Sequence, residues 1–214
     1  MADWVTISSL ATAGGTMVLA LATFGSIRSA NGAARVAERA LLAQQRPILT
    51  PSRENDPTEH IRFLEGTVLD VAGHGCSLVV KDDKLFMAIA VRNGGAGMAV
   101  LDRWRGEVLS TGSGSGPRPE LDTFRRLTRD LYIPAGDSGF WQGAIRERSD
   151  SDYAPLRAAI ERGERIVIDL LYGDHEGGQR TIARFGVSSA NARDGEAGRV
   201  DVVRYWNVDG SDPR

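Results

Sequence analysis

The sequence predicts a mainly β protein: a two-sheet antiparallel β-sandwich with one short helix, preceded by an N-terminal transmembrane helix and a helical stalk. Three observations lead to this prediction. Residues 4–27 carry no charged side chain, residues 28–46 repeat small apolar side chains at helical spacing, and short apolar segments separated by Gly, Pro, Asp and Asn follow Pro47. We therefore divide the chain into a transmembrane anchor (1–27), a helical stalk (28–46) and a β-sandwich domain (47–214).

Residues 4–27 are long enough to cross a bilayer as a helix. At 1.5 Å per residue they span about 36 Å, against about 30 Å for the hydrocarbon core. Seven of them are Ser or Thr and three are Gly, but hydroxyl groups can bond to carbonyls of the preceding turn and cost little in a spanning helix. Trp4 and Arg28 stand at the two ends, where interfacial aromatic and basic residues belong.

Two alternatives to a membrane span stay open. One is a buried or partner-covered helix in a soluble protein. The other is a cleaved secretory signal, although the first three residues, Met-Ala-Asp, lack the basic residues that such a signal carries.

Basic residues follow the anchor and do not precede it. Arg28, Arg35, Arg39 and Arg46 lie after residue 27, whereas only Asp3 and the amino group precede residue 4. The positive-inside rule then predicts a single-pass protein of the cell membrane with its C-terminal domain in the cytoplasm. The chain has a single cysteine, Cys76, and no Asn-x-Ser/Thr acceptor for glycosylation. Both observations agree with a cytoplasmic location, where disulfides are rare.

The stalk, residues 28–46, has the spacing of an amphipathic helix. Asn31-Gly32 predicts a kink or a restart, and Pro47 ends the helix because the residue before proline resists helical geometry. A self-associating stalk, continued in the bilayer by Ala11 and Gly15, would make the protein a homo-oligomer. The alternative is a plain amphipathic spacer. The apolar positions are Ala33, Val36, Ala37, Ala40 and Leu41.

Eleven segments after Pro47 read as strands because they are rich in Val, Ile, Leu and aromatic residues. Residues 85–91 are apolar on both faces and predict a central strand, whereas residues 180–187 alternate and predict a strand with one wetter face. The predicted strands are residues 48–50, 60–65, 67–71, 77–80, 85–92, 98–109, 129–133, 140–146, 165–172, 180–187 and 200–206.

Turn residues and one helix separate these strands. The glycines of residues 93–97 and 173–178 predict tight reversals that use positive φ angles, and residues 111–117 predict a flexible loop. Residues 153–162 predict a helix that Asp152 can cap, that tolerates Pro155 in its first turn, and that Gly163 ends.

The chain resembles a group of uncharacterised bacterial single-pass membrane-anchored proteins. The resemblance lies in the N-terminal span, the stalk ending in Gln45-Arg46-Pro47, the hairpin of residues 91–100, and the stretches 129–134 and 171–174. It implies that the soluble part is an immunoglobulin-like β-sandwich. It implies no activity, because none of its motifs is catalytic.

Composition and motifs exclude several classes of function. Residues 1–46 carry four Arg against Asp3 and Glu38, a net charge of +2, which leaves residues 47–214 at −4 because the whole chain carries −2. An acidic domain is a poor nucleic-acid binder. The phosphate-binding loops, the G-x-S-x-G elbow and H-E-x-x-H do not occur. We expect no cofactor and no catalytic residue.

Asp174, His175 and Glu176 form the most polar cluster, and Arg180 lies close by. A carboxylate, an imidazole and a second carboxylate can hold a divalent ion or act as an acid/base pair, which makes these residues weak candidates for a metal site. The alternative is that the acidic residues solvate a reversal in which the glycines do the turning. We favour the turn, because a mobile tip lacks the rigid support that catalysis needs.

Three further groups have both a functional and a structural interpretation. His74 and Cys76 could be two metal ligands, or a thiolate and the base that activates it. The structural alternative is that Cys76 packs as a small apolar residue and has no role together with His74. Asp169, inside an apolar strand, is a catalytic acid or the partner of a buried ion pair. Its candidate partners are Arg129, Arg146, Arg184 and Arg204. The aromatic residues are a binding platform or core, and these are Trp104, Tyr132, Phe140, Trp141, Tyr205 and Trp206.

Taken together, these patterns predict a membrane-anchored protein whose β-sandwich is a binding or scaffolding module for a protein partner. The sequence does not identify that partner. The alternatives are a metal-dependent hydrolase that uses Asp174, His175 and Glu176, and an extracytoplasmic sensor if the topology is inverted.

Overall fold

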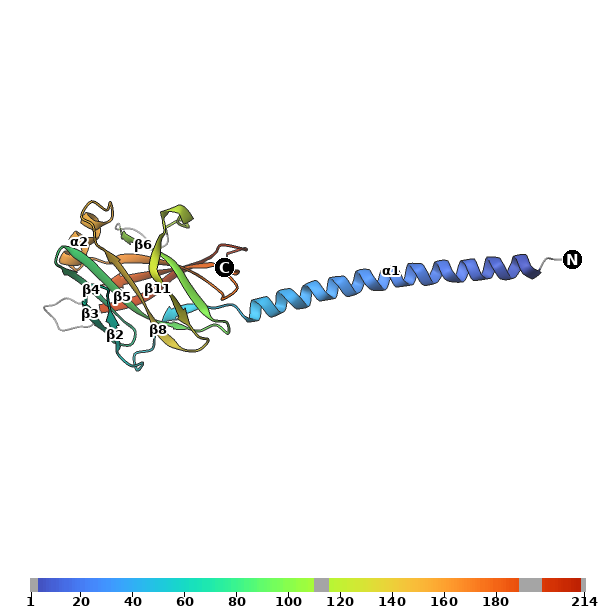
Figure 1. The fold of residues 1–214 in the computed structure, drawn as a ribbon, viewed down its shortest axis with the longest axis horizontal. Coiled ribbons are helices and arrows are strands. Elements are labelled where there is room, and N and C mark those ends of the chain that lie inside the picture. The colour runs from blue at the N-terminus through green and yellow to red at the C-terminus, as the bar shows by residue number, and fades with distance from the viewer. Residues whose placement is uncertain (1–3, 110–115, 189–197, 213–214) are drawn as a thin grey trace. The chain divides into compact units, whose positions relative to one another are not determined.

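The computed structural model describes residues 4–109, 116–188 and 198–212, without the side chains of residues 4–8, 11, 39, 42 and 43. The chain divides into two compact units, Met1–Gln44 and Gln45–Arg214. The first unit contains a helix and the second contains a β domain (Figure 1). The predicted flexible loop, residues 111–117, lies almost wholly outside the described residues.

Helix α1 runs without a break from Trp4 to Gln44. The helix does not restart at Asn31-Gly32, one of the two predicted possibilities, since both residues lie within the continuous helix, where Ala-rich flanks favour helical backbone. Two hydroxyls bond back along the helix as expected, from Thr16 Oγ1 to the Thr12 carbonyl at 2.8 Å and from Thr23 Oγ1 to the Leu19 carbonyl at 2.7 Å. The helix ends shortly before Pro47, as predicted.

The prediction that residues 4–27 span a membrane finds no support in the fold. Among the residues that the structure describes, no helix is long and apolar enough to cross a bilayer. Ser, Thr and Gly dilute the apolar side chains of this stretch.

All eleven predicted strands form, with shifts of a few residues at their ends. The strands are β1 (Leu49–Pro51), β2 (Glu59–Arg62), β3 (Val68–Val71), β4 (Gly75–Lys81), β5 (Lys84–Asn93), β6 (Ala99–Val108), β7 (Arg125–Ile133), β8 (Ser138–Ile145), β9 (Ile166–Gly173), β10 (Thr181–Ser188) and β11 (Gly198–Asn207). A 3₁₀ turn (Leu121–Thr123) precedes β7, and helix α2 (Tyr153–Arg162) precedes β9.

Nine of the strands form one antiparallel sheet, and β2 and β3 form a separate hairpin. The sheet has the order β1-β5-β4-β11-β10-β9-β6-β7, and β8 pairs with β5. It curls, so that side chains from all parts of it meet in one large apolar cluster that also takes in α2. The mainly β, antiparallel part of the prediction is confirmed. The two-sheet, immunoglobulin-like sandwich is not confirmed, because one sheet supplies the core from its own inner face.

Strand β5 is central, as the apolar run predicts. Its residues 85–91 are all buried, and alternate side chains enter two different clusters. Leu85, Met87, Ile89 and Val91 face the large core, whereas Phe86, Ala88 and Ala90 pack against the β2–β3 hairpin. The hairpin therefore forms a second layer over the outer face of β5, where the ring centroids of Phe63 and Phe86 lie 4.9 Å apart.

Strand β10 has no wetter face, so this part of the prediction is wrong. Ile182 is fully buried and Arg184 is 5% exposed, although both lie on the side expected to meet solvent. The reason is that residues 116–124, the described end of the connection from β6 to β7, pack across this face, where Phe124 joins a cluster with Leu171, Ile182 and Trp206. The sequence offers no sign of this cover, because the connection itself is polar.

The two ends of α2 differ in how well they follow the prediction. Gly163 ends the helix in the left-handed conformation, with φ 68°, as predicted. Asp152 makes no capping hydrogen bond, so that prediction is wrong. Its carboxylate forms an ion pair with Arg125 instead.

The turn after β5 depends on Asn93 and on close packing rather than on positive φ angles. Asn93 is fully buried, and its Oδ1 accepts hydrogen bonds from the backbone of Ile48 at 3.2 Å and Gly95 at 3.0 Å. A Cβ on Gly95 would lie 2.2 Å from the Arg46 carbonyl oxygen, and none of the glycines in residues 94–97 has positive φ. Glycine is needed here because the segment before β1 passes too close for a side chain.

Candidate binding sites

The hairpin of Asp174, His175 and Glu176 is built as a turn. Asp174 is buried, and its Oδ1 accepts hydrogen bonds from the backbone of Glu176 at 3.1 Å and Gly178 at 2.8 Å. Its Oδ2 accepts a bond from Gln179 at 3.3 Å. His175 and Glu176 are exposed, and His175 Nε2 lies 4.0 Å from Glu176 Oε1. The Asp174 carboxylate is thus occupied by the turn.

His74 and Cys76 do not act on a common atom. His74 donates its backbone N–H to Ser52 Oγ at 2.8 Å, and its Nδ1 lies 3.1 Å from the Ser52 carbonyl. The Cys76 thiol instead donates to the Ser188 carbonyl at 3.3 Å. Burial raises the pKa of Cys76 to about 12, so the thiol stays protonated and unreactive at neutral pH. In the described parts of the chain, no three His, Cys, Asp or Glu side chains are placed to hold a metal ion.

Asp169 is half of a buried ion pair, and its partner is Arg184. Arg184 Nε and Nη2 donate to the two carboxylate oxygens at 2.7 and 2.9 Å, and the two residues are direct cross-strand neighbours on β9 and β10. The hydrogen bonds that Arg184 donates to the Asp169 carboxylate raise the pKa of Arg184 above its ordinary value. This confirms the structural interpretation and selects one of the four arginines that the sequence offered.

The pair belongs to a row of charged side chains that crosses four strands. Arg105 on β6 is the register partner of Asp169, with Nη1 3.6 Å from Asp169 Oδ2, and Arg204 on β11 is the register partner of Arg184. Arg184 and Arg204 stack on the ring of Trp206, at 4.9 and 5.5 Å from its centroid. The row therefore carries three guanidinium groups and one carboxylate on the outer face of the sheet.

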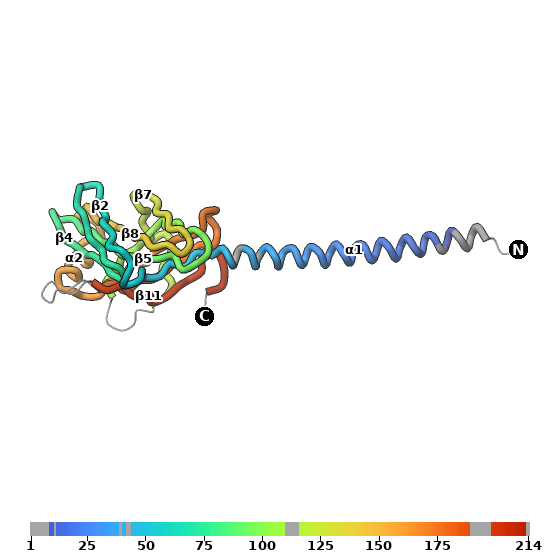
Figure 2. The backbone as a smooth tube through the Cα atoms, turned by 90° about the horizontal axis from the view of Figure 1, so that it is seen from below, coloured from blue at the N-terminus to red at the C-terminus, as the bar shows by residue number. Residues whose placement is uncertain are grey.

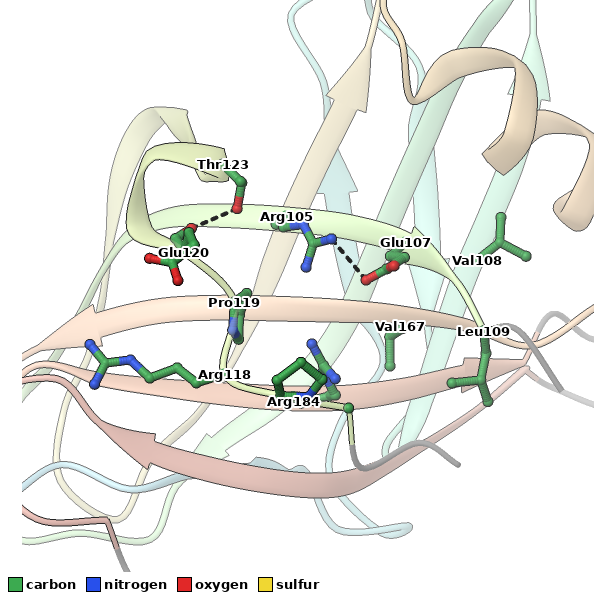
Figure 3. A pocket seen from close by; sticks show the side chains of 12 residues that line it. Arg105, Glu107, Val108, Leu109, Arg118, Pro119, Glu120, Thr123, Val167 and Arg184 are labelled. Carbon is green, nitrogen blue, oxygen red and sulfur yellow. Dashed lines mark hydrogen bonds and ion pairs between the residues drawn. The ribbon is translucent and has the colours of Figure 1, made fainter. Parts of the chain in front are cut away.

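A cleft of about 520 Å³ lies over part of this row (Figure 3). Arg105 and Arg184 line it from the strands, and Arg118 and Glu120 line it from the connection that follows β6. Arg105 Nη2 pairs with Glu107 Oε2 at 2.9 Å, and Arg118 Nη1 donates to the Asn207 carbonyl at 3.2 Å. Each guanidinium group in the cleft thus has a partner within the chain, so the cleft combines both signs of charge without a marked excess.

Most of the aromatic residues pack in the core, as the core interpretation predicts, but Phe140 is only half-buried and Tyr132 is exposed. Trp104, Trp141 and Trp206 are buried, and the ring centroids of Trp104 and Trp141 lie 5.2 Å apart in an edge-to-face contact. Tyr205 donates its hydroxyl to the Leu49 carbonyl at 2.6 Å. Tyr132, which is 60% exposed, stands out on β7.

The sequence analysis did not identify the strand edges of β7 and β8 that lack a pairing partner. In the part of the chain that the structure describes, β7 pairs only with β6 and β8 only with β5, although a four-residue turn (134–137) joins them. Leu101 pairs with Leu131 and Arg103 with Arg126, so residues 127–130 bulge out of the ladder. A strand pattern does not reveal which of its edges is left free, and this feature could not be predicted.

No family model, curated protein or solved structure matches the chain.

Proposed function

We propose that the chain is a membrane-anchored protein whose β domain serves as a binding or scaffolding module. The observation that carries the proposal is that the first unit contains a single helix, α1, so no second element within that unit covers its apolar side chains. Within residues 9–27 the exposed large apolar residues are Leu10, Met17, Val18, Leu19, Leu21, Phe24 and Ile27. Such a surface is stable when lipid or another protein covers it.

Lipid is the cover that best fits the charge pattern. Residues 4–27 contain no charged side chain, and the arginines begin at Arg28. A helix that binds a protein partner usually keeps a polar face for solvent, whereas a helix in a bilayer has apolar or small side chains on every side. The same charge asymmetry supports a cytoplasmic β domain. The finding that no helix is apolar enough to cross a bilayer applies to the described residues. The proposed span also includes residues 4–8 and 11, whose side chains are not among them.

The β domain supports a binding role through its surfaces rather than through reactive groups. Its one large core is closed, its cysteine is protonated, and its polar hairpin uses Asp174 for the turn. Against this background the exposed features are the cleft beside Arg105 and Arg184 and the free strand edges of β7 and β8. Fold alone implies no function, so the proposal depends on these surfaces.

Membrane association is tested by washing membranes from cells that make the full-length chain. We expect the wild type to resist both high salt and alkaline carbonate, and the variant Leu19→Arg with Leu21→Arg to be released. Each arginine near the centre of a span costs about 2.5–3.5 kcal/mol of insertion free energy. The matched control is Val36→Arg with Leu41→Arg, which adds the same charge to α1 outside the proposed span and is expected to stay bound.

Release of the wild type by carbonate would contradict the anchor and assign α1 to a protein partner. A reporter fused to the C-terminus distinguishes the two topologies: activity only on the cytoplasmic side agrees with the proposal, and activity only outside would favour the sensor alternative. Stoichiometric bound metal that disappears in His175→Ala would favour the hydrolase alternative over a binding module.

A further inference from the structure

Three strand edges without a pairing partner border one groove of the β domain. Among the described residues β2 pairs only with β3, β7 only with β6, and β8 only with β5. Both β7 and β2 lie in contact with β8, and Figure 2 labels the three strands on the same side of the domain. The groove between them has a volume of about 480 Å³. A free edge presents backbone N–H and C=O groups that another strand can bind.

The floor of the groove carries a buried polar group without a partner. Gln142 on β8 is 9% exposed, and its Oε1 is fully buried and accepts no hydrogen bond. A buried amide oxygen without a donor costs free energy, so the groove is incomplete as it stands. The backbone of residues 127–130, which leaves the β6 ladder, forms the wall on the β7 side. Because Gln142 lines the groove, a turn of its amide toward the groove would let Oε1 accept a hydrogen bond from a partner's backbone N–H.

The rim of the groove is basic and partly apolar. Arg62 from β2 and Arg129 from β7 are exposed, and neither pairs with a carboxylate of the described chain. By contrast His60, also at the groove, already has Asp70 at 2.6 Å. Leu64, 84% exposed, and Phe140 add apolar surface. The two free guanidinium groups select carboxylates, and the apolar contacts select alternate aliphatic side chains.

We propose that this groove binds an extended acidic segment of a partner protein, which adds to the domain as a further β-strand. Its backbone pairs with the free edge of β7 at residues 127–130, its carboxylates meet Arg62 and Arg129, and one of its amides donates to Oε1 of Gln142 after that side chain turns toward the groove. The inference names the kind of partner for the proposed binding module, and it does not depend on whether α1 enters a membrane.

The test is fluorescence anisotropy with the full-length chain and a labelled synthetic peptide of alternating valine and glutamate with blocked ends. We expect saturable binding of this peptide. Replacement of every glutamate by lysine should abolish it, and N-methylation of alternate backbone amides should abolish it as well, because the methyl groups remove the donors that pair with a strand edge.

Arg62→Glu with Arg129→Glu is expected to weaken peptide binding at least about tenfold, since attraction at two positions becomes repulsion. The matched control is Arg28→Glu with Arg35→Glu, which changes the net charge equally on α1 and should leave the affinity unchanged. Gln142→Leu should weaken binding several-fold while the thermal midpoint of the free protein stays equal or rises, because it removes an unpaired buried group. A purely structural Gln142 would change the midpoint without changing the affinity.

Three results would overturn the inference. The first is equal binding of the lysine or the N-methylated peptide, and the second is unchanged affinity in the doubly reversed arginine variant. The third is a concentration-dependent dimer that this variant dissociates, which would assign the groove to a second copy of the chain. Because none of these results bears on the carbonate wash, failure here and failure of the membrane anchor can be told apart.

Discussion

Replacing Asp169 by alanine is expected to lower the free energy of unfolding by about 3–5 kcal/mol. The carboxylate is 1% exposed, and both of its oxygens accept hydrogen bonds from Arg184, which is itself buried. Without Asp169, the Arg184 guanidinium would remain charged beneath the β6–β7 connection with little access to water. Urea unfolding of the full-length chain, followed at the β domain, measures the change.

The matched variants separate a lost charge partner from lost packing. Asp169→Leu combined with Arg184→Met should recover most of the stability, because an apolar pair of similar volume replaces a buried ion pair at little cost. Glu164→Ala removes an ion pair with Arg162 in which both side chains are exposed, and should change little. If the double variant unfolds as easily as Asp169→Ala, the pair does not act as a unit.

Asn93→Asp, a change of one side-chain atom, is expected to cost about 3–5 kcal/mol at neutral pH. The Asn93 Nδ2 donates to the carbonyl oxygens of Gly97 at 2.6 Å and Ile133 at 3.0 Å, and the residue has no exposed surface. An aspartate oxygen in its place would face two carbonyls, and each buried acceptor left without a donor costs about 1–3 kcal/mol. The hydrogen bonds of Asn93 connect the start of β1, the turn after β5 and the end of β7, so the substitution weakens the contacts among these three segments.

The cost of Asn93→Asp should depend on pH in a definite direction. Burial beside carbonyl oxygens raises the pKa of the new carboxyl in the folded state above the value of about 3.9 in the unfolded state. The folded state then binds more protons, so stability relative to wild type falls as the pH rises above about 4. Urea unfolding at pH 4 and pH 7 measures this, with Asn31→Asp on α1 as the exposed control. A pH-independent difference would show that the carboxylate reaches water.

The local sequence pattern was sufficient to locate the strands, but it did not predict which faces of each strand are buried. Residues 85–91 identified β5 because an apolar run needs cover on both faces, and the hairpin that supplies this cover lies nearby in the chain. For β10, the same argument predicted a wet face at Ile182 and Arg184. It was wrong because the cover comes from residues 116–124 in the connection before β7, and no periodicity marks a connection that packs across a sheet.

The candidate sites show the same limit. Asp169 was correctly interpreted as half of an ion pair, since a carboxylate in an apolar strand needs a partner, but the register of β9 and β10 was needed to choose Arg184. The turn after β5 was correctly placed, yet the role of Asn93 depends on contacts with Ile48 and Ile133, which are distant in sequence. The groove between β2, β7 and β8 exists because the described strands leave these edges unpaired. The alternation of side chains along a strand does not reveal which of its edges will pair.

The central claim, that the domain binds a partner through open strand edges, is tested most directly by hydrogen exchange of the full-length chain with and without the valine–glutamate peptide. The amides of residues 127–130 should exchange much faster than those of β9, which is paired on both sides, and should become protected when the peptide is added. Protection of residues 127–130 as strong as that of β9 in the free protein would contradict the account, because the edge would then already be closed. Unchanged exchange there under saturating peptide would contradict the binding mode.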